Sequence, residues 1–214
     1  DTGKNLIGAF YQPELVCADP QTLDTLPMRE YTSGMAEVIK HALIRDPDLF
    51  EALEDHLVPV MARKDREIVS SVIEDAVGVK ADVVSADERE EGRRAILNFG
   101  HTFAHALERV AGYGAFTHGE AVAIGMRAGL YLSHQRHPEA VPRERLDHVI
   151  RAVPIESDPA EVPFPDLYAA MAADKKNEGG TIRFVLLEQL GQAYVTGDVT
   201  EADARHAWQF ACSN

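Results

Sequence analysis

Apolar residues recur with the spacing of an α-helix through most of this chain. Met35, Val38, Ile39, Ala42 and Leu43 follow one another at intervals that place their side chains on one face of a helix. Similar patterns predict helices over about residues 65–84, 93–110, 118–134, 143–153, 165–173 and 200–211. Apolar runs on both sides of a Gln-Leu-Gly turn predict a small β-hairpin near 182–196. We therefore expect a mainly α fold with a short extended N-terminal segment.

The composition excludes several classes of protein. Of the 214 residues, 45% are hydrophobic, which is typical of a chain that folds around a core. The 35 acidic residues exceed the 21 basic ones, so the net charge is −14, and neither nucleic acid nor an anionic membrane is an expected partner. No apolar run approaches the roughly 20 residues of a membrane-spanning helix. The two cysteines are far apart and no signal peptide is recognisable, so we expect a cytoplasmic protein.

A stripe of polar residues interrupts the apolar pattern between residues 93 and 110. Arg94, Asn98, His101, His105 and Glu108 are spaced four, three, four and three residues apart. On one continuous helix they would share an arc of about 80°. Arginine, asparagine and histidine side chains in such a stripe are suited to holding a specific ligand, whereas a solvated helix face usually has lysine and glutamate there.

The histidines of this stripe are candidate metal ligands. His101 and His105 have the spacing that lets two imidazoles of one helix reach the same ion, and His118 follows after a glycine-containing turn. A catalytic zinc site commonly includes a carboxylate, and Glu37, within an apolar helix, is a candidate. Simpler interpretations remain open at this point, because Glu37 and Lys40 also have the spacing of an ordinary helical ion pair. A histidine pair alone does not establish a metal site.

Five blocks of the sequence resemble motifs of the 3-dehydroquinate synthase family. The blocks are GKNLIGAFYQP (3–13), SGMAEVIK (33–40), KADVV followed by LNFGHTF (80–103), HGEAVAIGM (118–126), and DKKN followed by IRFVLL (174–187). The resemblance implies the helical C-terminal domain of the dehydroquinate synthase-like fold. It also implies a division into an extended segment, 1–26, that joins a nucleotide-binding domain, and a zinc- and substrate-binding domain, 27–214.

The same resemblance implies roles for individual residues. The ligands of a zinc ion, or of a cobalt ion in its place, would be Glu37, His101 and His118. Catalytic roles would belong to His105, Lys40, Lys80 and Glu90. Substrate contacts would come from Asn5, Arg94, Asn98 and Arg183, and a cofactor contact from Lys4. Lys80 taken alone would be an ordinary surface lysine. One departure from the family pattern is Ala104, where many members have glycine, and we expect its extra methyl group to be tolerated.

The reaction implied is the conversion of 3-deoxy-D-arabino-heptulosonate 7-phosphate to 3-dehydroquinate and phosphate, a step of the shikimate pathway of aromatic amino-acid biosynthesis. NAD oxidises a ring hydroxyl, phosphate leaves by β-elimination, the ketone is reduced again, and an intramolecular aldol step closes the carbocycle. The resemblance also implies a homodimer for the full-length enzyme. The chain begins at Asp1 and has no Gly-x-Gly-x-x-Gly fingerprint. We therefore expect the isolated chain to bind zinc without binding NAD or turning substrate over.

Three alternatives remain. Other sugar-phosphate cyclases, such as 2-deoxy-scyllo-inosose synthase or valiolone synthase, share the zinc ligands and the chemistry but not the substrate. Metal-dependent alcohol or glycerol dehydrogenases have a similar architecture, although their first ligand is usually aspartate. A helical metal-binding module without catalytic activity is the third. The combination of Arg94, Asn98 and His105 favours dehydroquinate synthase, because its substrate has a carboxylate to be recognised.

Overall fold

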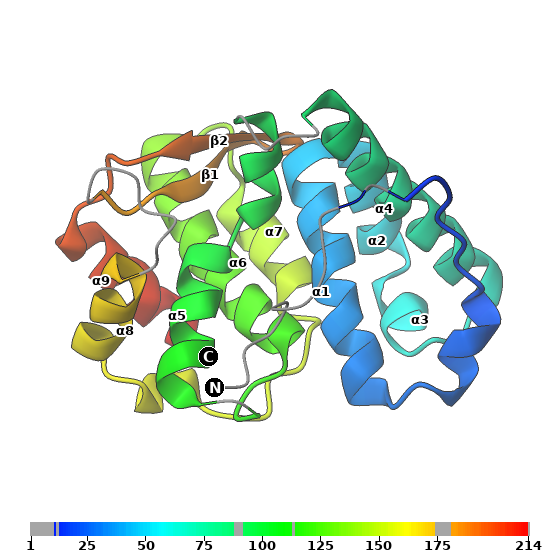
Figure 1. The fold of residues 1–214 in the computed structure, drawn as a ribbon, viewed down its shortest axis with the longest axis horizontal. Helices are drawn as coiled ribbons and strands as arrows, with labels where there is room; N and C mark the ends of the chain where they lie inside the picture. Colours follow the sequence, from blue (N-terminus) through cyan, green and yellow to red (C-terminus); the bar gives the residue numbers. More distant parts are fainter. Residues whose placement is uncertain (1–10, 12, 88–91, 113, 174–180, 214) are drawn as a thin grey trace.

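Helices make up most of the structure, as the apolar periodicity predicts (Figure 1). The computed structural model describes residues 11, 13–87, 92–112, 114–173 and 181–213. Their α-helices are α1 (Met28–Arg45), α2 (Pro47–Asp55), α3 (Leu57–Met61), α4 (Arg66–Ala86), α5 (His101–Ala111), α6 (His118–Arg136), α7 (Arg143–Ile150), α8 (Phe164–Ala172) and α9 (Glu201–Cys212). Three 3-10 helices are η1 (Pro20–Thr25), η2 (Arg93–Asn98) and η3 (Pro159–Glu161), and the strands are β1 (Phe184–Gln189) and β2 (Gln192–Thr196).

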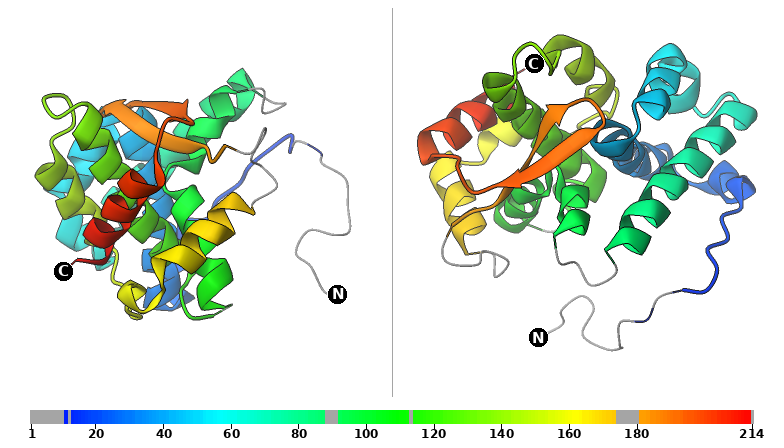
Figure 2. Two further views of the ribbon diagram at one scale, coloured as in Figure 1. Left: turned by 90° about the vertical axis from the view of Figure 1, so that its left-hand side faces the viewer. Right: turned by 90° about the horizontal axis from the view of Figure 1, so that it is seen from above.

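Helix α6 lies at the centre of the domain, where it contacts α1, α5, α7, α9 and β1 (Figures 1 and 2). It is buried on all sides, as expected for a helix without a polar face. Its glycines allow direct backbone contact with two neighbours. A Cβ atom on Gly119 would lie 2.0 Å from the carbonyl oxygen of Ser33 in α1, and one on Gly125 would lie 2.0 Å from that of Gly100, just before α5. These contacts fix α1 and the start of α5 against α6.

The continuous helix predicted for residues 93–110 is wrong. The chain forms η2, turns at Phe99 and Gly100, and begins α5 at His101. Gly100 has a φ of +82°, in the left-handed region that favours glycine. A Cβ atom there would also lie 2.7 Å from the backbone nitrogen of Met126. The break therefore results from packing against α6, a long-range contact that helical periodicity does not report.

The predicted hairpin is confirmed, with its first strand beginning at Phe184. The strands pair antiparallel, from Phe184 opposite Thr196 to Gln189 opposite Gln192. Buried residues of β1 pack on α6, and the amide of Gly191 in the turn donates to the carbonyl of Leu43 in α1, at 2.9 Å. The hairpin thus closes one side of the helical domain.

The N-terminal region differs in part from the extended segment predicted for residues 1–26, because residues 20–25 form η1. Asp19 starts this short helix by accepting a hydrogen bond from the amide of Gln21. Among the described residues, no helix combines the length and apolar character that crossing a membrane requires.

Candidate metal centre

Three side chains from three helices converge at one point. Glu37 lies in the middle of α1, His101 is the first residue of α5, and His118 is the first residue of α6. The Oε1 atom of Glu37 is 3.7 Å from the Nε2 atom of each histidine, and the three ligand atoms all lie within 4.8 Å of one another. In a tetrahedral zinc site, ligand atoms about 2.1 Å from the metal are about 3.4 Å apart. Small side-chain movements therefore suffice to close this set around an ion.

The two oxygens of Glu37 have different surroundings. Oε2 accepts a hydrogen bond from the buried ammonium of Lys40, at 2.5 Å. Oε1 is buried, and no donor among the described residues reaches it. A buried carboxylate oxygen without a donor is costly unless a cation occupies the space that it faces. The donor set of one carboxylate and two imidazoles is one that zinc and cobalt accept, so the residues present fit a divalent metal ion.

Hydrogen-bond partners at the far side of each ring direct the Nε2 atoms toward Glu37. The Nδ1 atom of His101 is 3.2 Å from the carbonyl oxygen of Phe99. The Nδ1 atom of His118 is 3.2 Å from the Oε1 atom of Glu108 in α5. In both histidines an acceptor therefore faces Nδ1, which favours the tautomer that leaves the Nε2 lone pair free for a metal ion.

Charge and burial prepare these ligands for binding near neutral pH. Burial lowers the pKa of His101 to about 4, and the nearby charge of Lys40 acts in the same direction, so this imidazole is neutral. The hydrogen bond with Glu108 raises the pKa of His118. Burial works to raise the pKa of Glu37, but the charge and hydrogen bond of Lys40 leave it below its usual value. Glu37 is therefore anionic, and protons compete with a metal ion mainly at His118.

The first turn of α6, which contains His118, is anchored to α1. The guanidinium of Arg29 donates two hydrogen bonds to the buried carboxylate of Glu120, at 3.1 and 2.9 Å. Glu120 also accepts from the amide of Thr117, at 2.6 Å, which completes a capping box. The amide of Gly119 donates to the Oγ atom of Ser33, at 3.0 Å. Sequence analysis did not identify these anchors, since Arg29 and Glu120 are 91 residues apart.

The polar stripe predicted on one helix is divided between two elements. Arg94 and Asn98 belong to η2, and both are partly buried. His101, His105 and Glu108 share one face of α5. The His105 ring centroid lies 5.3 Å from that of His101 and 6.3 Å from that of His118, so the structure places this imidazole beside the candidate ligands.

The other predicted site residues have varied surroundings. Lys40 is buried against Glu37. Lys80 is exposed on α4, yet it is near enough for its charge to add to the effect of burial in lowering the pKa of Lys40. Arg183 is exposed just before β1, and its carbonyl oxygen accepts a hydrogen bond from Thr102 in α5, at 2.9 Å. Three predicted residues lie outside the described part of the chain: Lys4, Asn5 and Glu90.

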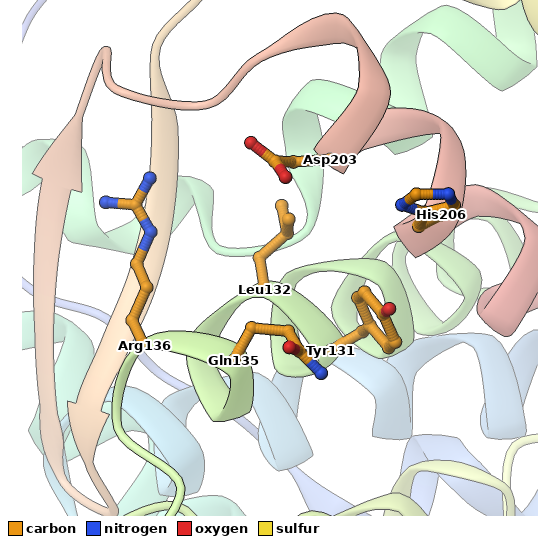
Figure 3. Close-up of a pocket in the computed structure, with 6 residues that line it drawn as sticks. All are labelled: Tyr131, Leu132, Gln135, Arg136, Asp203 and His206. Atoms are coloured by element: carbon orange, nitrogen blue, oxygen red, sulfur yellow. The ribbon is translucent and has the colours of Figure 1, made fainter.

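A separate pocket of about 310 Å³ opens between the C-terminal part of α6 and α9 (Figure 3). Its lining consists of Tyr131, Leu132, Gln135, Arg136, Asp203 and His206. None of the predicted site residues that the structure describes lines it. Tyr131 is 13 residues after His118, which is about 20 Å along a helix axis, so this pocket is not part of the candidate metal centre.

Comparison with known proteins gives a consistent family. Residues 34–177 match the family described as 3-dehydroquinate synthase C-terminal, and residues 1–33 match 3-dehydroquinate synthase N-terminal. The 3-dehydroquinate synthase of Acidithiobacillus ferrooxidans is 48% identical over 204 residues, which cover 94% of this chain and 55% of that protein. That of Nitrosospira multiformis is 47% identical over 204 residues, with the same coverage. This chain thus spans about half the length of these relatives.

Solved structures agree with the fold predicted from the sequence. The 2-epi-5-epi-valiolone synthase of Streptomyces hygroscopicus, with NAD+ and Zn2+ bound, matches with a TM-score of 0.84 and 29% identity, over 97% of this chain and 58% of that one. A 2-deoxy-scyllo-inosose synthase with carbaglucose-6-phosphate, NAD+ and Co2+ matches with a TM-score of 0.76 and 27% identity, over the same shares of the two chains. The helical architecture and the resemblance of the sequence motifs are both confirmed. The chain belongs to the 3-dehydroquinate synthase family.

Proposed function

We propose that this chain is the metal- and substrate-binding part of a 3-dehydroquinate synthase, which converts 3-deoxy-D-arabino-heptulosonate 7-phosphate into 3-dehydroquinate and phosphate. The enzyme would use a divalent metal ion, zinc or cobalt, together with NAD, and would act as a cytoplasmic homodimer in the shikimate pathway. Residues 27–214 would form the zinc- and substrate-binding domain, and 1–26 the connection to the nucleotide-binding domain.

The observation that supports this proposal most is the convergence of the Glu37 Oε1 atom, which lacks a donor among the described residues, with two Nε2 atoms directed toward it. Glu37, His101 and His118 would hold the metal ion. When bound, the ion supplies Lewis acidity, which favours loss of a hydroxyl proton and polarises a carbonyl group. His105 lies beside these ligands, and an imidazole can act as a general base and acid by accepting and returning a proton.

Cationic residues on elements next to those of the metal centre would suit a substrate with two anionic groups. Lys80, Arg94 and Arg183 lie on α4, on η2 and just before β1, three elements that border α1 or α5. Arginine pairs with carboxylate and phosphate through parallel hydrogen bonds, and lysine contributes a compact charge. We assign these residues, with Asn98, to the phosphate and carboxylate of the substrate. The proposed roles of Asn5, Glu90 and Lys4 concern residues outside the described structure.

A carboxylate on the substrate distinguishes this proposal from the other cyclases. Relatives 45–48% identical are 3-dehydroquinate synthases, whereas the valiolone and inosose synthases are 26–29% identical. Calorimetry of the zinc-loaded chain should detect binding of the heptulosonate phosphate and much weaker binding of a hexose 6-phosphate, which has no carboxylate. Equal or tighter binding of the hexose phosphate would favour another sugar-phosphate cyclase.

Metal content and growth test the proposal in complementary ways. Elemental analysis of the purified, zinc-loaded chain should give near one zinc per chain, and Glu37→Gln should lose most of it. Less than about a tenth of one equivalent in the unaltered chain would refute the metal site. Introducing Glu37→Gln into the gene of the source cell should make growth depend on added aromatic amino acids. Unimpaired growth without them would contradict the assigned pathway.

A further inference from the structure

The two histidines of the metal centre are held to different degrees. The side chain of His101 is 12% exposed, whereas that of His118 is 46% exposed. Each histidine is the first residue of its helix, His101 of α5 and His118 of α6, so the difference between them lies in their burial. The orientation of His118 therefore depends more on its own hydrogen bonds than that of His101 does.

The hydrogen-bond acceptors that face the two Nδ1 atoms also differ, in their charge. His101 is paired with the carbonyl oxygen of Phe99, a backbone group two residues away. His118 is paired with the carboxylate of Glu108, which lies two turns after His101 on the same face of α5. A hydrogen bond to an ionised acceptor is about twice as strong as one to a neutral group. The less enclosed histidine therefore has the stronger partner.

The charge balance of the site gives Glu108 a second effect. A divalent cation would meet one carboxylate, Glu37, and two neutral imidazoles. The charge of Glu37 is already offset by Lys40, whose ammonium is 2.5 Å from the Oε2 atom. Glu108 supplies the next carboxylate, 3.2 Å from the far nitrogen of His118. Its charge favours a cation at this site, where the pairing of Glu37 with Lys40 leaves little net negative charge.

We propose that Glu108 is a positioning residue of the metal centre: its carboxylate holds the ring of His118 in the tautomer whose Nε2 lone pair faces Glu37, and thereby increases the affinity for a divalent ion. This inference rests on the proposed function. It adds a residue that was included in the sequence stripe but had no predicted role. Helix α5 then contributes to the centre in two ways. It provides the ligand His101, and through Glu108 it orients the ligand His118.

Zinc affinity is to be measured by competition with a chelator in the wild-type chain, Glu108→Ala, Glu108→Gln and the control Glu139→Gln. Groups that hydrogen-bond to the far nitrogen of a metal-ligating histidine typically contribute a factor of 10–100 in metal affinity. We expect Glu108→Ala to bind zinc about 10–100-fold more weakly. The zinc affinity of Glu108→Gln should lie between those of wild type and Glu108→Ala, at least threefold weaker than wild type. The amide oxygen of the glutamine can accept a hydrogen bond from Nδ1, but it is uncharged. Glu139 is exposed beyond the far end of α6, so its variant should bind like wild type.

A second measurement separates positioning from a purely structural role. Nitrogen-15 NMR of the metal-free protein reports which nitrogen of His118 bears the proton. We expect the proton on Nδ1 in the wild type and a shift toward Nε2, the form preferred in water, in Glu108→Ala. The inference would be overturned by zinc affinity within twofold of wild type in either Glu108 variant, or by an unchanged tautomer in Glu108→Ala. If the wild-type chain itself does not bind zinc, both the role of Glu108 and the proposed function are refuted.

Discussion

The contact between Gly119 and Ser33 determines how two of the candidate metal ligands face each other. Glu37 is four residues after Ser33 in α1, and His118 immediately precedes Gly119 in α6. In Gly119→Ala, the new Cβ atom would lie 2.0 Å from the carbonyl oxygen of Ser33 and 2.5 Å from its Cα atom. These are backbone atoms of a helix, so they cannot move aside as a flexible side chain would.

The displacement required is large compared with the tolerance of a metal site. Restoring an ordinary contact of about 3.2 Å requires α1 and α6 to separate by about 1.2 Å. Metal–ligand distances tolerate deviations of about 0.2 Å. Overpacking of this kind also costs about 1–3 kcal/mol of stability. We expect Gly119→Ala to reduce zinc affinity at least 100-fold and to lower the free energy of unfolding by about 2 kcal/mol.

The assay combines chelator competition with urea unfolding. Trp208 is the one tryptophan of the chain, and it stacks on Phe103 of α5 at a centroid distance of 6.4 Å, so its fluorescence reports unfolding near the site. Gly34→Ala is the matched control, because a Cβ atom on this exposed α1 residue would meet no atom of the other described elements within 4 Å. It should bind zinc normally and gain up to about 1 kcal/mol from helix propensity. Wild-type zinc affinity in Gly119→Ala would refute the proposed dependence on this contact.

Three further predictions concern buried ionisable side chains. Arg127 donates to Asp147 and to carbonyl groups at the end of α9, so Arg127→Met should cost about 3 kcal/mol in urea unfolding while leaving zinc stoichiometry unchanged. Burial, assisted by Lys40, lowers the pKa of His41 to about 4. The unfolded state then binds more protons between about pH 6.5 and 4, so stability should fall as pH decreases through that range, and His41→Leu should recover about 2 kcal/mol of the loss measured at pH 4.5. Lys40→Met leaves Glu37 without its cation, so zinc should raise the melting temperature more than in wild type; an equal or smaller rise would contradict the charge balance described above.

Local sequence patterns were sufficient for most of the helices and for the hairpin. The apolar periodicity around Met35 and that around Val69 correspond to α1 and α4 because the apolar side chains of both helices pack into the core. The prediction failed at Gly100, where the polar spacing continued but the backbone did not. That turn depends on contact with Gly125, 25 residues later, and no window of helical length contains both residues.

The candidate site shows the same division between local and long-range information. Motif resemblance selected Glu37, His101 and His118, and the structure brings them together. It did not indicate how they are held, since the anchoring pair Arg29 and Glu120 joins two helices that are distant in sequence. These supports depend on the packing of α1 against α6, which follows from the complete fold rather than from any motif.

The strongly acidic composition and an anionic substrate are compatible because charge is distributed unevenly. The chain has a net charge of −14, yet the carboxylate of Glu37 is offset by Lys40. Under the proposed function, the metal ion, Lys40, Glu37 and Glu108 together have a net charge of +1, to which Lys80, Arg94 and Arg183 add. A positive site in an acidic protein binds an anion through short-range contacts, because at longer range the remaining charges repel it. Added salt should therefore weaken binding of the heptulosonate phosphate less than it would for a site within a broadly basic surface.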